Sequence, residues 1–402
     1  MKTKYGLLSN VQFCTRCTMS NQRPVPVGEM KYKKNAYKPT DAFNKEGICA
    51  ACQFSDIKKD KIDWRKREKE LLELCSKYRS KSRSEYDCIV PGSGGKDSRF
   101  TSHILKEKYG MNPLTVTWAP HIYTDIGKKN HASWIDNVDN ILITPSIETH
   151  RKLTNLAFRN LLHPFQPFVF GQRYAALKVA KRFNIPLVFH GESPFEYGSS
   201  DPVKDSKKSG FDKKYFVSKK DFNEIYLGGI SVKELIKKHK LPLSDLFWYL
   251  PIFETEFKKF KLNYKFLGYY LKWNPQEVFY YAVNNTGFIP NPERTEGTYS
   301  KYASLDDRID GFHYYTSFIK FGLGRATMDT AQEIRNGLLT RDEGLSLVKK
   351  YDGEFPSKYF QEILEYMRID EKNFWKLINA ARSPHLWSKK SGEWNLKHKV
   401  WE

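Results

Sequence analysis

The chain has 402 residues, and its 40% hydrophobic, 15% aromatic and 28% charged content is that of a globular protein large enough for two or three domains. Its formal net charge of +21 favours an acidic partner (nucleic acid, an anionic membrane surface or phosphorylated small molecules), although a solvated lysine-rich surface explains it equally well. The sequence shows no apolar signal-peptide core and no run of about 20 apolar residues, which excludes a membrane-spanning protein and predicts a cytoplasmic one with reduced cysteines.

Two Cys-x-x-Cys pairs lie near the start of the sequence, Cys14 with Cys17 and Cys49 with Cys52, separated by 31 residues. In a reducing compartment this pattern is typical of a tetrahedral zinc site, with free or redox-active thiols as the alternative. Four sulfur ligands leave no open coordination position, so the zinc would be structural. Prolines and glycines are frequent here, so we expect residues 1–56 to be a small metal-stapled module of loops rather than long elements.

A very basic helix is predicted over residues 60–83, where it connects this module to the first strand. Cys75 falls on the apolar face of that helix and Cys88 falls in the strand, so both are expected in the core. No cysteine follows Cys88, and the rest of the chain therefore offers no thiol for chemistry.

The next stretch is a short apolar strand that runs into three glycines within four residues, Gly92, Gly94 and Gly95, and then into a helix. Glycines let backbone N–H groups approach a phosphate closely, and a helix start adds unpaired donors and the positive end of its dipole. Strand, turn and helix start together therefore predict an anion site. The polar side chains available to it are Ser93, Lys96, Asp97 and Ser98.

Two commoner glycine loops do not fit this stretch. The Walker loop requires a glycine where Val90 stands and a serine or threonine where Asp97 stands, and the dinucleotide fingerprint requires a third glycine at Asp97. A glycine turn without a ligand is the remaining alternative, but strand, loop and helix all lie where phosphate binding needs them. We expect Lys96 and Asp97 to stand exposed at the helix start, so that little packing depends on them.

Strands and helices alternate after the glycine loop, which predicts an α/β fold with a parallel, Rossmann-like sheet and helices on both faces. Ligands bind beyond the carboxyl ends of the strands in such sheets, so we expect the glycine loop, Thr117 and the Gly191-Glu192 pair at one edge. The predicted strands after the first are 113–118, 140–143 and 185–190, and the predicted helices are 149–162 and 173–183.

Three further segments complete the predicted organisation. Residues 57–200 form the sheet domain, residues 201–260 an insertion that is partly loop, and residues 261–402 a mainly helical region. The insertion would cover the site or meet a partner, and a merely solvated loop is at least as good an interpretation. Its lysines are Lys204, Lys207, Lys208, Lys213, Lys214, Lys219 and Lys220. The predicted carboxyl-terminal helices are 313–321, 327–337, 341–350, 356–367 and 371–381.

The stretch Ser-Gly-Gly-Lys-Asp-Ser at 93–98 resembles the PP-loop of the ATP pyrophosphatase superfamily. Together with the cysteine pairs, Gly191-Glu192, Glu-Tyr-Gly at 196–198 and Lys-Phe-Gly-Leu-Gly-Arg-Ala-Thr at 320–327, it makes the chain similar to the N-acetyl sugar amidotransferase family. That family acts in the biosynthesis of lipopolysaccharide O-antigen and of flagellin sugars such as pseudaminic and legionaminic acid. The resemblance extends from Cys14 to about Trp387.

The resemblance implies a reaction in which the acetamido group of a sugar or nucleotide sugar becomes an acetamidino group. ATP adenylylates the amide oxygen, and ammonia then displaces AMP from the imidate. Ammonia is mostly protonated at neutral pH, so the family takes it from a glutaminase subunit that works with a cyclase-like subunit, similar to a pair of the histidine pathway. The present sequence has no thiol after Cys88 to serve as a glutaminase nucleophile.

The resemblance also implies roles for individual residues, with Mg²⁺ neutralising the departing pyrophosphate. The implied ATP-binding residues are Ser93, Gly94, Gly95, Lys96, Asp97, Ser98, Thr117 and Gly191. The implied catalytic residues are Lys96, Asp97, Glu192, Lys320 and Arg325, and the implied Mg²⁺ ligands are Asp97 and Glu196. As alternatives, Glu192 and Glu196 would be ordinary loop carboxylates, and Lys320 and Arg325 would form salt bridges in the helical region.

The main rival is a PP-loop enzyme that modifies tRNA, which the positive charge would suit. Sulfur transfer, however, usually needs a persulfide cysteine or a cluster beyond the loop, and lysine ligation to tRNA would leave the cysteine pairs unexplained. A zinc-binding adaptor with a decayed ATP site is a third possibility. Every polar position of the loop is filled, which argues against decay. We therefore expect no nucleic-acid partner.

Overall fold

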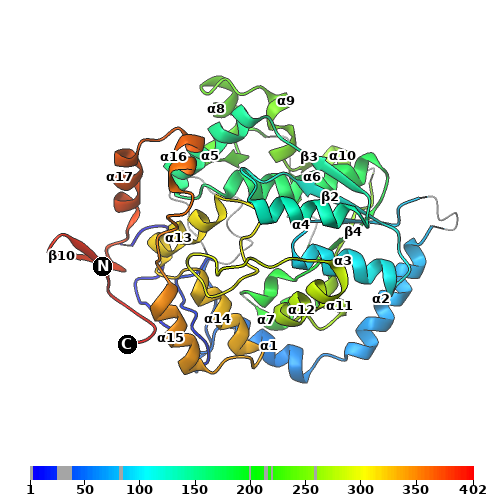
Figure 1. The fold of residues 1–402 in the computed structure, drawn as a ribbon, viewed down its shortest axis with the longest axis horizontal. Helices are drawn as coiled ribbons and strands as arrows, with labels where there is room; N and C mark the ends of the chain where they lie inside the picture. Colours follow the sequence, from blue (N-terminus) through cyan, green and yellow to red (C-terminus); the bar gives the residue numbers. More distant parts are fainter. Residues whose placement is uncertain are drawn as a thin grey trace.

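The computed structural model describes residues 3–24, 39–80, 85–198, 201–211, 216–218, 221–257 and 260–402. Its centre is a five-stranded sheet in which each neighbouring pair of strands is parallel (Figure 1). The predicted α/β fold with a parallel sheet is therefore confirmed. In sheet order the strands are β3 (Asn140–Ile143), β2 (Pro113–Trp118), β1 (Cys88–Pro91), β4 (Leu187–His190) and β9 (Asn263–Phe266).

Alternating side chains of the strands fill two cores, one on each face of the sheet. Ile89 and Val188 pack with α6 (Gln166–Arg182) in one core, whereas Val90 packs with α3 (Lys96–Glu107) in the other. Both faces of the sheet are thus covered, as is usual for parallel strands. Cys75 and Cys88 are buried in the second core, as expected, and burial raises the pKa of Cys75 to about 11.

The order of the strands creates a switch point between β1 and β4. The chain proceeds from β1 to β2 and β3 on one side, and then places β4 and β9 on the other side of β1. Connections that leave neighbouring parallel strands in opposite directions open a crevice at the carboxyl ends of those strands. The glycine loop follows β1 and the Gly191-Glu192 pair follows β4, so both lie at this crevice, as predicted.

The segment 201–260 is packed more closely than a solvated loop would be. Its apolar residues, among them Phe216, Leu235 and Leu250, join the core of β1 and α6. Lys204 and Lys207 are exposed, and Lys208 pairs with Asp205 at 2.6 Å, while Lys213, Lys214, Lys219 and Lys220 lie outside the described residues. Its elements are α7 (Pro202–Asp205), β5 (Val217–Ser218), β6 (Tyr226–Leu227), β7 (Ile230–Ser231), α8 (Val232–Lys237), α9 (Leu243–Leu246), η4 (Phe247–Tyr249), β8 (Ile252–Phe253) and α10 (Glu254–Phe257).

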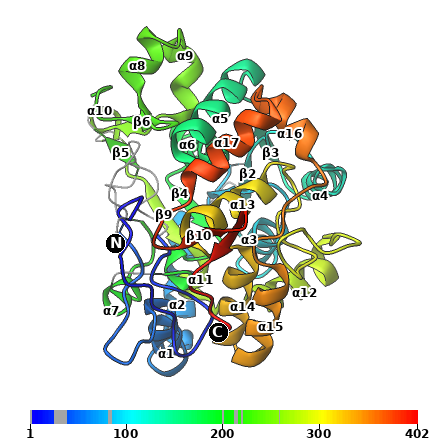
Figure 2. The same ribbon diagram turned by 90° about the vertical axis from the view of Figure 1, so that its left-hand side faces the viewer.

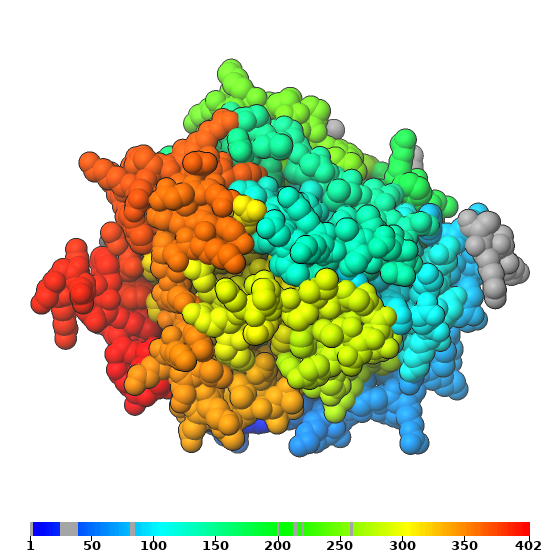
Figure 3. Space-filling view, viewed as in Figure 1, coloured from blue at the N-terminus to red at the C-terminus, as the bar shows by residue number. Residues whose placement is uncertain are grey.

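The carboxyl-terminal part is helical, as predicted, and ends in a hairpin that was not predicted. Its yellow segment lies between the cyan helices of the sheet and the orange helices that follow (Figure 3). The helices are α11 (Leu267–Tyr270), α12 (Pro275–Thr286), α13 (Asp310–Phe321), α14 (Arg325–Arg335), α15 (Arg341–Tyr351), α16 (Phe360–Met367) and α17 (Glu371–Ala381). The hairpin strands are β10 (Trp387–Lys390) and β11 (Glu393–Leu396).

Two expectations about the amino-terminal part were wrong in detail. The cysteine module contains α1 (Ala50–Asp60), a helix that begins directly after Cys49 and buries Ala51, Cys52 and Phe54. The helix expected over 60–83 is α2 (Trp64–Tyr78), which is shorter because the Asp63 side chain caps its start.

Two other helices, α4 (Asp125–Ile135) and α5 (Ile147–Leu161), flank β3, and only α5 was predicted. Within the described residues, no helix combines the length and apolarity needed to cross a bilayer.

Close packing of α6 on β2 gives the first testable prediction. A Cβ atom on Gly171 would lie 2.1 Å from Cε2 of the buried Trp118, so Gly171→Ala overpacks the core. We expect a loss of about 1–3 kcal/mol of unfolding free energy and a lower melting temperature. Gly311→Ala in α13 is the matched control, because the nearest atom to its added Cβ is Cβ of Pro356 at 3.2 Å. A melting temperature of Gly171→Ala at or above that of the control would contradict this packing.

Candidate functional site

A cavity of about 590 Å³ lies at the carboxyl ends of β1 and β4. One wall is the glycine loop with Glu192, and the opposite wall comes from α13, α14 and the segment before them. The volume falls in the range of small-molecule sites, and the location is the switch point of the sheet. Among the residues of the sequence-based site, the cavity is lined by Ser93, Gly95, Lys96, Asp97, Glu192 and Arg325.

Two glycines of the loop are required by its backbone path. A Cβ on Gly92 would lie 2.1 Å from Cβ of Ser98, and Gly94 has φ of +86° and lies against the backbone of Asn130. The third, Gly95, is the N-cap of α3, and it makes no side-chain capping bond. The first N–H groups of α3 thus begin at the cavity wall, which is the arrangement that binds anions.

The charged side chains of the loop form a contact of their own. Nζ of Lys96 lies 2.6 Å from Oδ1 of Asp97 and 5.5 Å from the centre of the Tyr302 ring. Lys96 is only 9% exposed, so the expectation of an exposed lysine at the helix start was wrong. Burial raises the pKa of Asp306, which also lines the cavity, and the Ser93 hydroxyl opposes that rise. The Ser98 hydroxyl instead bonds within the loop, accepting from N–H of Gly94 and donating to the Gly95 carbonyl.

Glu192 is the carboxylate that follows β4 at the cavity wall. Burial, with the nearby negative charge of Asp97, raises the pKa of Glu192 to about 7. The Tyr197 hydroxyl donates to Oε2 of Glu192. Glu192 is therefore poised near neutral pH, where a carboxyl group can both accept and release a proton.

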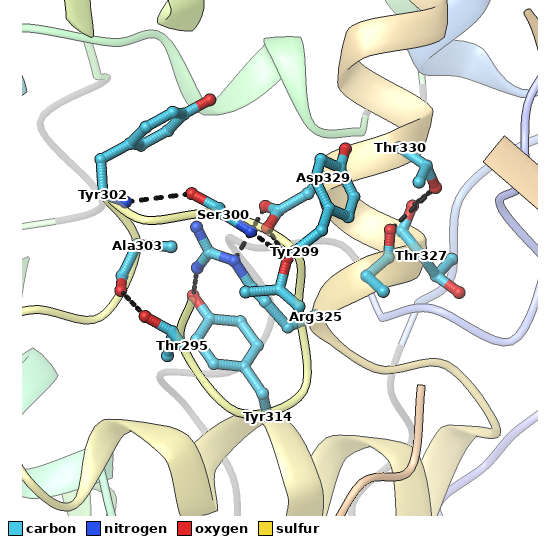
Figure 4. A network of polar contacts seen from close by, with 12 residues as sticks. Thr295, Tyr299, Ser300, Tyr302, Ala303, Tyr314, Arg325, Thr327, Asp329 and Thr330 are labelled. Carbon is cyan, nitrogen blue, oxygen red and sulfur yellow. Dashed lines mark hydrogen bonds and ion pairs between the residues drawn. The ribbon is translucent and has the colours of Figure 1, made fainter. Parts of the chain in front are cut away.

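The opposite wall holds a polar network around Arg325 at the start of α14 (Figure 4). Nε of Arg325 donates to Oδ1 of Asp329 at 2.8 Å, Nη1 donates to the Tyr314 hydroxyl, and the guanidinium lies 4.5 Å from the centre of the Tyr314 ring. The Thr298 hydroxyl donates to the other oxygen of Asp329 at 2.6 Å. The network holds the Arg325 guanidinium in place at the cavity, whose lining also includes residues of the glycine loop.

Six residues of the sequence-based site are not among those that line the cavity: Gly94, Ser98, Thr117, Gly191, Glu196 and Lys320. Thr117 is buried in β2 and accepts from Asn140, and Gly191 packs against Thr101 and Trp273. Lys320 is buried in α13, where its Nζ donates to the Leu161 carbonyl at 3.2 Å. Glu196 forms a buried ion pair with Lys58 of α1 at 2.8 Å.

The four cysteines of the two pairs form one buried cluster, with all ligand atoms within 4.8 Å of one another. Sγ atoms are 3.9 Å apart for Cys14 and Cys52 and 3.7 Å apart for Cys17 and Cys49. Zinc–sulfur bonds of about 2.3 Å in a tetrahedron require sulfur atoms about 3.8 Å apart. Backbone N–H groups of Arg16 and Cys49 donate to Sγ of Cys14, which is the support that a thiolate needs. The cluster could therefore bind zinc.

The cysteine cluster contacts α14 directly. Ala331 of α14 packs among the cysteines, and the Thr18 hydroxyl donates to the Thr327 carbonyl at 3.0 Å and lies 2.9 Å from the Thr330 hydroxyl. Figure 2 shows the dark-blue amino-terminal segment and α1 at the same end of the molecule as α14. The helix that carries Arg325 and the cysteine cluster thus form one unit.

Several lining residues were missed from the sequence. Tyr302, Asp306, Tyr314 and Asp329 lie outside the motifs recognised in the sequence, and they reach the cavity because the chain returns to the sheet edge after α12. Burial raises the pKa of Asp310, just outside the lining, to about 7. Arg325 and Asp329 stand four residues apart in a helix, a spacing that would have predicted their ion pair from the sequence.

Comparison with known proteins gives a family match for one part of the chain. The family described as "LPS biosynthesis protein WbpG-like, C-terminal domain" matches residues 296–400, which include Arg325 and Asp329. Among solved structures, NMN synthetase from Francisella tularensis aligns with a TM-score of 0.30 and 11% identity, over 71% of this chain and 96% of that one. No curated protein matches the chain.

The raised pKa of Glu192 predicts a pH-dependent effect of Glu192→Gln. Because the folded protein holds this proton up to about pH 7, against 4.5 for an ordinary glutamate, the wild type loses stability as pH rises between these values. The glutamine variant lacks this loss, so we expect it to be more stable than wild type at pH 8 by about 3 kcal/mol and equally stable near pH 4. Chemical denaturation at both values measures this, with exposed Glu393→Gln as the control. A stability difference independent of pH would contradict the assignment.

Proposed function

We propose that this protein is an ATP-dependent amidotransferase that converts the N-acetyl group of a sugar or nucleotide sugar to an acetamidino group, in the biosynthesis of lipopolysaccharide O-antigen or a flagellin sugar. The observation that carries the proposal is the composition of the cavity. The glycine loop forms one wall, and the segment matching the WbpG-like family forms the opposite wall. A loop that would bind phosphate thus faces a segment that matches a family of lipopolysaccharide biosynthesis.

The glycine loop would bind the β- and γ-phosphates of ATP through the N–H groups at the start of α3, with Lys96 adding charge. Asp97 would hold Mg²⁺, which would neutralise negative charge on the departing pyrophosphate. Ser93 lines the cavity, where its hydroxyl could donate to a phosphate oxygen. Glu196 is a weaker candidate for Mg²⁺, because its buried pairing with Lys58 already neutralises its charge.

The reaction would proceed in two displacements. The amide oxygen of the sugar attacks the α-phosphorus of ATP, forming an O–P bond as pyrophosphate leaves, because an amide oxygen leaves only once it is adenylylated. Ammonia then adds to the imidate carbon, the C–O bond to AMP breaks, and the proton lost by nitrogen passes to a base. Arg325, opposite the loop, would stabilise negative charge on the phosphates, and Glu192 is the carboxylate near neutral pKa that could take the proton.

Ammonia would come from a separate glutaminase working with a cyclase-like subunit. A glutaminase needs an activated nucleophile, usually a cysteine beside a histidine. The four cysteines of the cluster contact one another, and Cys75 and Cys88 are buried in the sheet core. Among the residues that the structure describes, no cysteine lines the cavity.

Zinc in the cysteine cluster would have a structural role, since four sulfurs close its coordination shell. Its effect on the site would pass through α14, whose Thr327 and Thr330 contact Thr18 next to Cys17. The metal would therefore keep Arg325 and Asp329 at the cavity without touching a substrate.

We expect about one zinc per chain in protein purified without added metal, measured by elemental analysis. Cys14→Ser should lose the metal and much of its folding stability, because binding of a structural zinc contributes directly to folding. Cys75→Ser is the matched control: it replaces an equally buried cysteine outside the cluster, so it should retain zinc despite reduced stability. Wild-type protein without metal, or a disulfide within the cluster, would rule out the zinc site.

AMP release tests the proposed function itself. With ATP and an N-acetylated sugar or nucleotide sugar, the isolated protein should form AMP with ammonium salts at high pH, where free NH₃ is abundant, and should ignore glutamine. Addition of the glutaminase and cyclase-like partners should let the protein form AMP with glutamine as the nitrogen source at neutral pH. Lys96→Ala should abolish AMP formation.

Two outcomes of this experiment would redirect the assignment. Efficient use of glutamine by the isolated chain would refute a separate ammonia source. AMP formation dependent on added tRNA, with no response to any N-acetylated sugar, would favour the tRNA-modifying class instead.

A further inference from the structure

Arg99, in the first turns of α3, is buried directly behind the glycine loop and is only 1% exposed. Its Nε donates to the Gly94 carbonyl at 2.9 Å. Its Nη1 donates to the Thr286 carbonyl at the end of α12, and Nη2 donates to the Asn130 carbonyl and the Ser133 hydroxyl of α4. One guanidinium therefore ties the loop to two helices that are distant in the sequence.

The bond from Arg99 to Gly94 fixes the orientation of one peptide group. In a trans peptide the carbonyl and the following N–H point in opposite directions. Because the Gly94 carbonyl points toward the buried guanidinium, the N–H of Gly95 points away from it, and Gly95 borders the cavity. Gly94, with its positive φ, and Gly95 lack side chains that would restrict this peptide, so the bond from Arg99 helps to fix its orientation.

The charge of Arg99 is not balanced by an ion pair. Burial lowers the pKa of Arg99 to about 10, which still leaves the side chain protonated at neutral pH. Its hydrogen-bond acceptors are three carbonyls and a hydroxyl, and over the described part of the chain no carboxylate lies within ion-pair distance of it. A buried cation is costly unless negative charge lies near it, and Asp136 is the charged group that raises the pKa of Arg99 against burial. An anion bound in the loop would add to that compensation.

We propose that Arg99 is a positioning residue of the phosphate site, which turns the Gly95 N–H toward the polyphosphate and supplies a cation behind the loop. The inference rests on the proposed use of ATP, and it adds a residue that no motif of the loop contains. Arg99 touches no substrate, since the loop backbone lies between it and the cavity.

The test is binding of pyrophosphate with Mg²⁺, and separately of ATP, to Arg99→Lys by calorimetry, with melting temperature measured in parallel. Lysine keeps the charge but cannot reach four acceptors, so we expect pyrophosphate binding at least about tenfold weaker than in wild type. Arg67→Lys is the matched control, because Arg67 also donates to two carbonyls, of Tyr269 and Ser206, away from the cavity. Its melting temperature should fall while its pyrophosphate affinity stays within about twofold.

A milder pair of variants covers the case in which Arg99→Lys does not fold. Ser133→Ala removes one acceptor of Arg99 and should weaken pyrophosphate binding about two- to fivefold, whereas exposed Ser346→Ala should leave it unchanged. Unchanged pyrophosphate affinity in folded Arg99→Lys or in Ser133→Ala would overturn the inference. A wild type that binds pyrophosphate and ATP but never forms AMP with an N-acetylated sugar would overturn the proposed function alone. A wild type that binds neither would overturn both.

Discussion

The contact between the cysteine cluster and α14 is the constraint on which the candidate site depends. The cavity has a second wall only while α14 stays beside the sheet, and the Thr18 hydroxyl holds that helix through Thr327 and Thr330. A module of this size buries too little apolar surface to stay folded by burial alone. The cysteine cluster therefore affects both the folding of the module and the position of Arg325. Stability of one end of the chain and geometry of the site are therefore linked.

The two walls of the cavity are built by different physical means. The loop wall presents backbone N–H groups, whose positions follow from glycine conformation and from the start of α3. The opposite wall presents side chains, which are fixed by hydrogen bonds such as those of Arg325 with Asp329 and Tyr314. Backbone donors suit a ligand group of constant shape, whereas a side-chain network can be altered residue by residue without disturbing the sheet.

The sheet and the glycine loop could be predicted because their signals are local: apolar strands, glycines with no room for a side chain, and a helix start. β9 was missed because its Asn-Tyr-Lys-Phe sequence is only half buried at the sheet edge, and α4 because it buries little besides Gly127, Asn130 and Trp134. The candidate site was harder to predict, because the direction in which a side chain points decides whether it lines the cavity, and the sequence does not give that direction. Glu192 faces the cavity whereas Glu196 turns to Lys58, and Gly322, with φ of +72°, reverses the chain between Lys320 and Arg325.

The bond from Thr18 to the Thr327 carbonyl spans 309 residues of sequence, which has a consequence for synthesis of the chain. At about 5–20 residues per second, the amino-terminal module waits roughly 15–60 s on the ribosome before its partner helix is translated. During that interval the face that will receive α14 is open to solvent and to other proteins. A bound metal would hold the nascent module in shape through this delay, so supply of the ion to the ribosome-bound chain would decide how many molecules mature.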